Sequence, residues 1–309
     1  MADDVACVDG CAPAMAAAYA LLLLRVSRPY YYLVTLWLYL LPTGGRADLL
    51  STRAFWLGAA YCTLPINLLC YLMNDAADVA VDKHNPRKGG ALLGAKEGAA
   101  TLRRALPTAV AVQLPFLLGF GAVCGAHIVP WFGGVVLVNW LYNFGPRLSS
   151  GNHAPLDLIC PCGYMLVIVL SCWLNALPYP PGRSWLHAGW LILRTQLWIQ
   201  TFDLDADAAA GRRTTAVRLG MRGSQLALAC LLLGETAFVH AAFAHSFPLR
   251  SFSVASLAML GAQATLSARG DAKAAGQPMS PSTVNATFLV LGLGGLGLML
   301  RVWIDEAFV

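Results

Sequence analysis

Nine apolar segments occupy most of this chain of 309 residues, and they constrain its fold more than any other feature. A helix that crosses a bilayer needs about 20 mostly apolar residues. The segments of suitable length span residues 22–43, 54–73, 105–124, 128–144, 155–177, 185–202, 225–246, 252–268 and 284–303. Because lipid offers no water to backbone polar groups, such segments form helices. The sequence therefore predicts an all-α, polytopic membrane protein with nine transmembrane helices.

The composition excludes a soluble protein. Hydrophobic residues make up 58% of the chain and charged residues only 12%, whereas a typical soluble domain is about 25% charged. The formal net charge of +5 is too small to indicate a nucleic-acid partner, so we expect a lipid bilayer and no nucleic acid around the chain. Neither a repeat nor a linker divides the sequence. We expect a single membrane-embedded domain over 1–309, with an N-terminal tail at 1–21.

The basic residues are unevenly distributed between the loops. If successive loops alternate across the membrane, most Lys and Arg residues fall on the side that holds the N-terminus. Cytoplasmic loops carry an excess of these residues. We therefore expect a multi-pass protein whose loops after the second and sixth segments lie on the cytoplasmic or equivalent inner side.

Acidic residues gather directly after the same two segments. Asp75, Asp78 and Asp82 follow the second segment. If the helix continues at about 100° per residue, these three and Asn74 lie within an arc of about 100°. After the sixth segment come Asp203, Asp205 and Asp207. Asp203 and Asp207 lie about 40° apart and Asp205 points almost oppositely. Two helices can thus each present carboxylates to one cavity.

Carboxylates held together in a membrane protein need a cation. A charge at mid-bilayer costs about 2.5–3.5 kcal/mol, and like charges repel one another. Oxygen ligands without His or Cys favour Mg²⁺, which typically bridges to phosphate oxygens. Basic residues follow both acidic groups, namely Lys83, Arg87, Lys88, Arg212 and Arg213. Carboxylates with Lys and Arg on the same loops indicate a site for a metal ion and a diphosphate.

These residues resemble the UbiA superfamily of intramembrane prenyltransferases. The stretch from Asn74 to Asp82 matches the first family motif, NDxxDxxxD, and Asp203 to Asp207 matches the second, DxxxD. The resemblance covers nearly the whole chain. It implies nine helices around a central cavity, with Mg²⁺ as the cofactor and a prenyl diphosphate as the donor. Arg28-Pro29 resembles the Arg/Lys-Pro pair often found in the first helix.

The resemblance also implies a role for individual residues. The implied metal ligands are Asn74, Asp75, Asp78, Asp82, Asp203 and Asp207, of which Asp75, Asp78, Asp203 and Asp207 are also the implied catalytic residues. The implied diphosphate-binding residues are Lys83, Arg87, Lys88, Arg147, Arg212 and Arg213. Tyr142 to Arg147 resembles a Tyr-x-x-x-Pro-x-Arg-x-Lys stretch of the family with compressed spacing and without its terminal Lys. Arg147 or Lys88 is expected to replace that lysine.

Polar and aromatic side chains inside the predicted helices are candidates for the substrate pocket, because polar residues within a membrane are commonly functional. The polar and tyrosine candidates are Asn67, Tyr142, Asn143 and Gln200, with Asn139 of similar standing. The further aromatic candidates are Tyr71, Trp140, Trp198 and Phe202. Arg194 faces away from Asp203 and is expected to pair with another helix, whereas Glu235 has no evident partner.

Three functions remain open at this stage. The first is transfer of a prenyl group to an aromatic or other lipid-soluble, hydrophobic acceptor. The second is a membrane terpene cyclase, in which the donor's own double bonds capture the cation. Both use the same metal–diphosphate site, so the motifs alone do not separate them. The third is a transporter, which the lack of a detectable inverted repeat disfavours.

Overall fold

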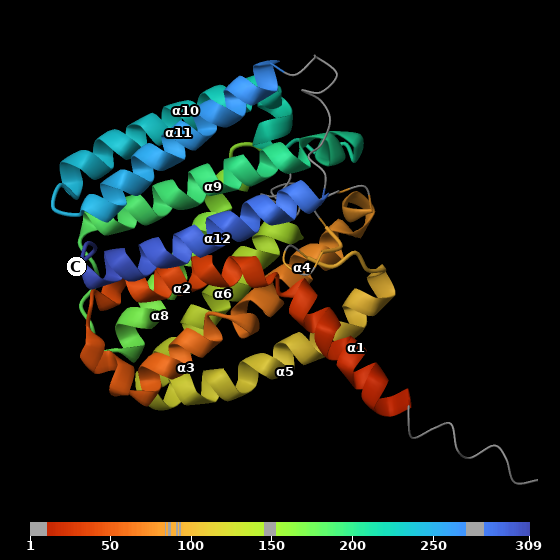
Figure 1. The fold of residues 1–309 in the computed structure, drawn as a ribbon. Helices are drawn as coiled ribbons and strands as arrows, with labels where there is room; N and C mark the ends of the chain where they lie inside the picture. The colour runs from red at the N-terminus through yellow and green to blue at the C-terminus, as the bar shows by residue number, and fades with distance from the viewer. Residues whose placement is uncertain are drawn as a thin grey trace, which may run out of the picture.

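The computed structural model describes residues 11–83, 85, 88–90, 92, 94–144, 153–269 and 281–309, and these ranges form a bundle of helices without a β-strand (Figure 1). The longer helices are α1 (Cys11–Val26), α4 (Leu64–Asp82), α5 (Ala99–Cys124), α6 (Ile128–Asn143), α9 (Gly182–Ala209), α10 (Thr215–Ala242), α11 (Phe247–Arg269) and α12 (Pro281–Ile304). The shorter ones are α2 (Tyr32–Leu40), α3 (Arg53–Tyr61), α7 (Leu156–Ile159) and α8 (Leu166–Leu174). Short 3₁₀ turns are η1 (Pro29–Tyr31), η2 (Leu41–Thr43), η3 (Ala47–Ser51), η4 (Gly125–His127) and η6 (Cys160–Met165).

The all-α prediction is confirmed, and each predicted apolar segment overlaps a helix. Four stretches are long and apolar enough to cross a membrane. They are Arg53–Asp82, Ala99–Asn143, Leu156–Leu174 and Thr215–Ala242. The number of nine crossings stays a prediction.

Three predicted segments are not the continuous helices that we expected. Segment 22–43 is broken where Arg28 takes a left-handed conformation, with φ of 52°, directly before Pro29. Segment 54–73 breaks at Thr63, and Pro65 then lies in the first turn of α4, where a missing N–H costs no helical bond. Segment 155–177 contains the 3₁₀ turn η6, which begins at Cys160-Pro161. In each case a proline favours restarting the helix over continuing it.

The helices lie side by side in an order that brings α4 next to α9. At one edge of the bundle α10 packs between α11 and α9, and at the other edge α5 packs on α4 and α3 (Figure 1). Helices α4 and α9 contact each other directly, which joins the helices at one edge to those at the other. Both helices run on beyond the predicted ends at 73 and 202, so that each acidic motif lies on the last turns of a helix.

Candidate functional site

A cavity lies between α4, α6, η6 and α9, and its wall changes from polar to apolar along the helices. The lining at the polar end includes Arg28, Asn74, Asp78, Asp82, Asn85, Lys88, Asn143, Asp203, Asp207, Arg212 and Thr214. The lining from earlier turns of α4 and α6, and from η6 and α8, includes Ile66, Cys70, Val135, Val138, Tyr164, Leu166 and Val167. Because α4 and α6 carry their polar residues at the same end, the cavity has one charged end and one apolar end.

The first motif packs against two basic side chains. Asp75 is 1% exposed, and its Oδ1 accepts hydrogen bonds from Arg28 Nη2 at 2.5 Å and from Lys88 Nζ. Lys88 Nζ also donates to Asp82 Oδ2 at 2.7 Å. The left-handed backbone at Arg28 directs its guanidinium to this end of α4, since a non-glycine residue holds such a conformation only when its surroundings enforce it.

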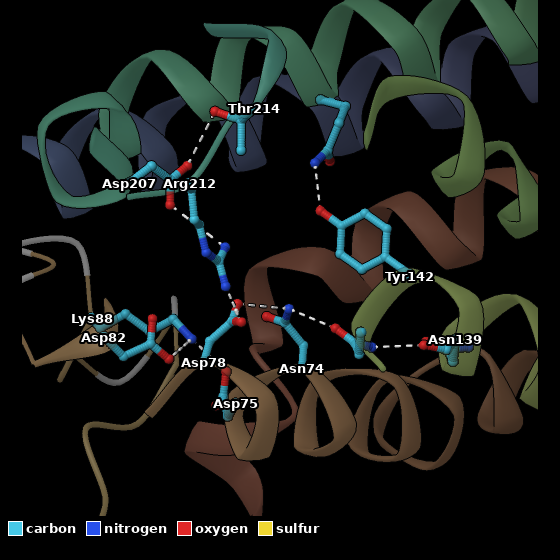
Figure 2. Close-up of polar contacts among 12 residues, drawn as sticks. Asn74, Asp75, Asp78, Asp82, Lys88, Asn139, Tyr142, Asp207, Arg212 and Thr214 are labelled. Carbon is cyan, nitrogen blue, oxygen red and sulfur yellow. Dashed lines mark hydrogen bonds and ion pairs between the residues drawn. The ribbon is translucent and has the colours of Figure 1, made fainter. Parts of the chain in front are cut away.

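Asn74 connects Arg28 and Asp78 to helix α6 by hydrogen bonds. Its Oδ1 accepts a hydrogen bond from Arg28 Nη2 at 2.8 Å. Its Nδ2 donates to Asp78 Oδ2 at 3.1 Å and to Asn143 Oδ1 on α6 at 3.0 Å. Figure 2 shows this chain of contacts running from Asp78 through Asn74 toward Asn139.

The second motif faces the first across the cavity. Arg212, in the loop after α9, pairs with Asp78 of α4 and lies 3.5 Å from Asp207 Oδ1 (Figure 2). Burial alone would lower the pKa of Arg212, but the carboxylates of Asp78 and Asp207 raise it. Asp203 Oδ1 accepts a hydrogen bond from Asn85 at 2.9 Å. Asp205 is exposed, as its helical phase predicts.

The residues at the charged end suit a divalent cation. Asp78, Asp82, Asp203 and Asp207 line this end of the cavity, and Asp75 is buried next to it, where it pairs with Arg28 and Lys88. Asp75 Oδ2 is buried and has no hydrogen-bond partner within the described ranges, although buried polar atoms are normally paired. In this arrangement no three of the described His, Cys, Asp or Glu residues converge on one point. A cation would therefore bind with rearrangement of the basic side chains that now separate the carboxylates.

Four predicted diphosphate-binding residues lie away from this cavity or outside the described residues. Lys83 and Arg213 are exposed and do not line the cavity. Lys83 directly follows the end of α4, and the binding of diphosphate by these two residues stays a prediction. Arg87 and Arg147 lie outside the described residues. Lys88 and Arg212 do line the cavity, as predicted.

The predicted substrate-pocket residues divide in the same way. Tyr142, Asn143 and Gln200 line the cavity, whereas Asn67 does not. Asn67 is fully buried, and its Nδ2 donates to Thr35 Oγ1 at 2.9 Å and to the Thr63 carbonyl at 2.7 Å. It therefore holds α4 to α2 at the break before α4, and its prediction as a pocket residue is wrong.

Most of the further aromatic candidates do not line the cavity. Tyr71 lines the cavity and packs under the Arg28 guanidinium, whose carbon lies 4.3 Å from the ring centroid. Trp140 is exposed on the outer face of α6. Trp198 and Phe202 are not among the lining residues and pack against each other.

Two residues at the site escaped the sequence reasoning. Asn85 has no charge and stands beyond the motif, so nothing in the sequence pointed to its bond with Asp203. Asp157 is fully buried and accepts hydrogen bonds from the N–H and Oγ1 of Thr215, at 2.5 and 2.6 Å, and from Gln200 Nε2 at 2.8 Å. It thereby ties α7, α9 and α10 together beside the second motif. A lone carboxylate within a predicted apolar segment was the available signal.

A separate ion pair lies on the far face of α9. Glu235 of α10 is 1% exposed and pairs with Arg194 of α9. The predicted pairing of Arg194 with another helix is confirmed, and the partner that sequence reasoning could not find for Glu235 is Arg194. Neither residue lines the cavity, so this pair has a structural role in joining α9 to α10.

Comparison with known proteins finds relatives of two kinds. No protein-family model matches the chain. A lycopene elongase/hydratase from Haloarcula japonica is 28% identical over 212 residues, which are 64% of this chain and 67% of the relative. A lycopene elongase/hydratase from Corynebacterium glutamicum is also 28% identical over 212 residues, 66% of this chain and 71% of the relative.

Solved structures of a UbiA homologue from Archaeoglobus fulgidus resemble this one. The structure bound to DMAPP and Mg²⁺ has a TM-score of 0.66 at 17% identity, over 91% of this chain and 98% of the homologue. The structure bound to GPP and Mg²⁺ has a TM-score of 0.62 at 17% identity, with the same coverage.

Proposed function

We propose that this chain, which has the UbiA fold, transfers a prenyl group from a prenyl diphosphate to an apolar acceptor in a reaction that needs Mg²⁺. One observation carries the proposal. Carboxylates of α4 and α9 face each other at one end of a cavity whose other end is apolar and aromatic. Such a cavity suits a substrate with a strongly anionic head and a hydrocarbon tail.

The charged end would hold the metal ion and the diphosphate. The carboxylates of Asp75, Asp78 and Asp82 on α4 and of Asp203 and Asp207 on α9 would bind Mg²⁺. The metal supplies positive charge that stabilises the departing diphosphate. Arg28, Lys88 and Arg212 would bind the diphosphate oxygens with charge-assisted hydrogen bonds. The Mg²⁺-bound homologue from Archaeoglobus fulgidus supports this assignment.

The apolar end indicates a neutral acceptor. Among the described lining residues, no acidic, basic or histidine side chain lies beyond the charged end of the cavity. An acceptor with a carboxylate would meet no partner there, and an unpaired buried charge is costly. A hydrocarbon with a terminal C=C bond would fit, and the names of the two lycopene elongase/hydratases support such an acceptor.

The reaction follows from this division. The allylic C–O bond of the donor breaks, its electron pair leaves with the diphosphate, and the basic side chains stabilise that negative charge. The aromatic faces of Tyr71 and Tyr164 stabilise positive charge, and the apolar wall excludes bulk water from the cation. The acceptor's C=C bond then attacks the allylic carbon, which forms the new C–C bond and leaves a cation on the acceptor. A carbon next to that cation loses a proton to an oxygen of the released diphosphate, which gives a neutral alkene. The distribution of Lys and Arg supports placing the charged end at the cytoplasmic or equivalent inner face.

The test is a product analysis with the full chain in lipid nanodiscs. Dimethylallyl diphosphate, Mg²⁺ and lycopene should give a C₅-extended carotenoid, identified by mass spectrometry, and omission of Mg²⁺ should abolish it. Geranyl and geranylgeranyl diphosphate without an acceptor provide the control for the cyclase alternative. A cyclic hydrocarbon or alcohol from the donor alone would overturn the transferase proposal.

A further inference from the structure

We propose that a buried aromatic layer, formed by Tyr61, Phe120 and Trp131, closes the apolar end of the cavity, and that Trp131 thereby limits the donor to about two isoprene units. The inference rests on the proposed function, because it concerns the hydrocarbon tail of the proposed donor. It deepens that function by naming the class of donor, short-chain prenyl diphosphates, and a residue that determines it.

The cavity ends at one level of the bundle. Among the described lining residues, none precedes Ile66 on α4 or Val135 on α6, and none follows Val167 on α8. All three side chains are buried. Because they face the cavity on one side only, other side chains must cover them from behind.

The aromatic layer lies at this end of the bundle, opposite the acidic motifs. Tyr61 is the last residue of α3, Phe120 lies on α5 and Trp131 on α6, and these helices pack together with α8 (Figure 1). The ring centroid of Tyr61 is 5.1 Å from that of Phe120 and 6.1 Å from that of Trp131. None of the three is more than 3% exposed, and they belong to the same buried core as the residues at the end of the cavity.

Trp131 is the member of this layer that lies directly behind the cavity wall. It precedes Val135 by one turn of α6, so the two side chains share a face of the helix. Its Nε1 donates to the carbonyl of Leu166 at 2.8 Å, and Leu166 lines the cavity at the start of α8. The indole therefore spans from α6 to α8 behind the cavity, and a smaller side chain would leave space continuous with the apolar end.

The depth of the apolar part can be read along α4. Asn74 lies at the charged end and Ile66 at the closed end, eight residues earlier on the same helix. At 1.5 Å per residue this is about 12 Å, close to the length of two extended isoprene units. With the diphosphate held at the charged end, a third unit would meet the aromatic layer. A close-packed core does not yield readily to such a group.

The experiment measures dissociation constants with Mg²⁺ for the full chain in nanodiscs, corrected for partition of each ligand into empty nanodiscs. The ligands are the S-thiolodiphosphates of the dimethylallyl, geranyl, farnesyl and geranylgeranyl groups. For the natural chain we expect the geranyl analogue to bind most tightly, because it buries more apolar surface than the dimethylallyl analogue and still fits. Trp131→Leu should tighten binding of the farnesyl analogue by about tenfold, since it relieves overpacking, and should change binding of the dimethylallyl analogue by less than about twofold.

A second variant tests the same end of the cavity in the opposite direction. Val135→Phe fills the apolar end, so it should weaken binding of the geranyl analogue by about tenfold relative to its effect on the dimethylallyl analogue. Trp140→Leu is the matched control, because Trp140 is exposed on the outer face of the same helix, and it should leave all four constants unchanged. If Trp131→Leu does not fold, Val135→Phe alone decides.

Two results would overturn the inference while leaving the proposed function intact. One is binding of the geranylgeranyl analogue to the natural chain as tightly as the geranyl analogue, since the tail would then leave the cavity between helices. The other is an unchanged order of affinities in the variants at positions 131 and 135. Failure of every analogue to bind the natural chain with Mg²⁺ would instead contradict the proposed function.

Discussion

Helix α9 carries buried charge on two faces, and the two groups differ in a way that distinguishes a site from a structural contact. Toward α10, one cation, Arg194, pairs with one anion, Glu235, away from the cavity. Toward α4, carboxylates from both motifs line an open cavity together with Arg28, Lys88 and Arg212. An ion pair closed between two helices leaves no room for a ligand, whereas carboxylates from two helices beside an open space can bind a cation. The comparison indicates that access to the cavity, more than burial of charge, marks the functional face.

The largest effect should come from removing a carboxylate that lines the cavity. We expect Asp78→Ala and Asp207→Ala each to lower kcat/KM for the prenyl diphosphate by more than about 100-fold, because each removes a ligand of the metal–diphosphate site. Because each change also removes a contact with Arg212, kcat/KM is compared per folded molecule, with thermal unfolding in detergent measured alongside. Full activity in either variant would contradict the assignment of that motif.

A smaller loss of activity should follow from removing the bridging arginine. Arg212 contacts carboxylates from both motifs, so Arg212→Ala should raise KM for the prenyl diphosphate by about 10- to 100-fold, as for the loss of a charge-assisted contact. Arg213 is the adjacent residue and is exposed, which makes Arg213→Ala the matched control. A KM in both variants equal to that of the natural chain would show that neither guanidinium binds the diphosphate.

Changes to the Arg194–Glu235 pair should alter stability and not catalysis. Glu235→Ala leaves the buried Arg194 without its partner, so we expect it to destabilise the protein by about 3–5 kcal/mol. Activity per folded molecule should be retained, as measured by thermal unfolding alongside turnover. The double variant Arg194→Met with Glu235→Leu should recover much of the stability, because it removes both charges. A loss of turnover in that stable double variant would place the pair in the site.

The smallest effect should be at the surface. Lys83 stands next to the first motif in sequence but is exposed. Lys83→Ala should therefore change KM for the prenyl diphosphate by less than about twofold, as is usual for an exposed charge. A tenfold increase in this KM would show that Lys83 does contact the diphosphate, as the sequence predicted.

The sequence predicted the all-α fold class, which is confirmed, and the fold is that of the UbiA homologue from Archaeoglobus fulgidus. Long apolar segments predict helices. The spacing of residues along a helix predicts which of them share a face, and Asp203 and Asp207 line the cavity whereas Asp205 is exposed. Both are local properties that one chain segment determines by itself. The same reasoning did not anticipate the helix breaks at Arg28 and Thr63, because a proline within a membrane segment is compatible with either a kink or a new helix.

The parts of the site that depend on packing between helices could not be predicted. Asn67 and Asn139 have the same chemistry and similar positions in an apolar segment, yet one bonds to α2 and the other lines the cavity. Lys83 and Lys88 both follow the first motif, but only Lys88 turns back to Asp75 and Asp82. Which side chain turns inward is decided by neighbours that are distant in sequence.

The most direct test of the central claim, that both motifs form one Mg²⁺-dependent diphosphate site, is the binding of geranyl S-thiolodiphosphate, an analogue that ionises slowly. The dissociation constant would be measured by isothermal titration calorimetry on the full chain in nanodiscs. We predict that binding weakens by more than about 100-fold when EDTA replaces Mg²⁺, and likewise in Asp78→Asn and in Asp207→Asn with Mg²⁺ present. Binding that is equally tight in EDTA, or that depends on only one of the two aspartates, would contradict the claim.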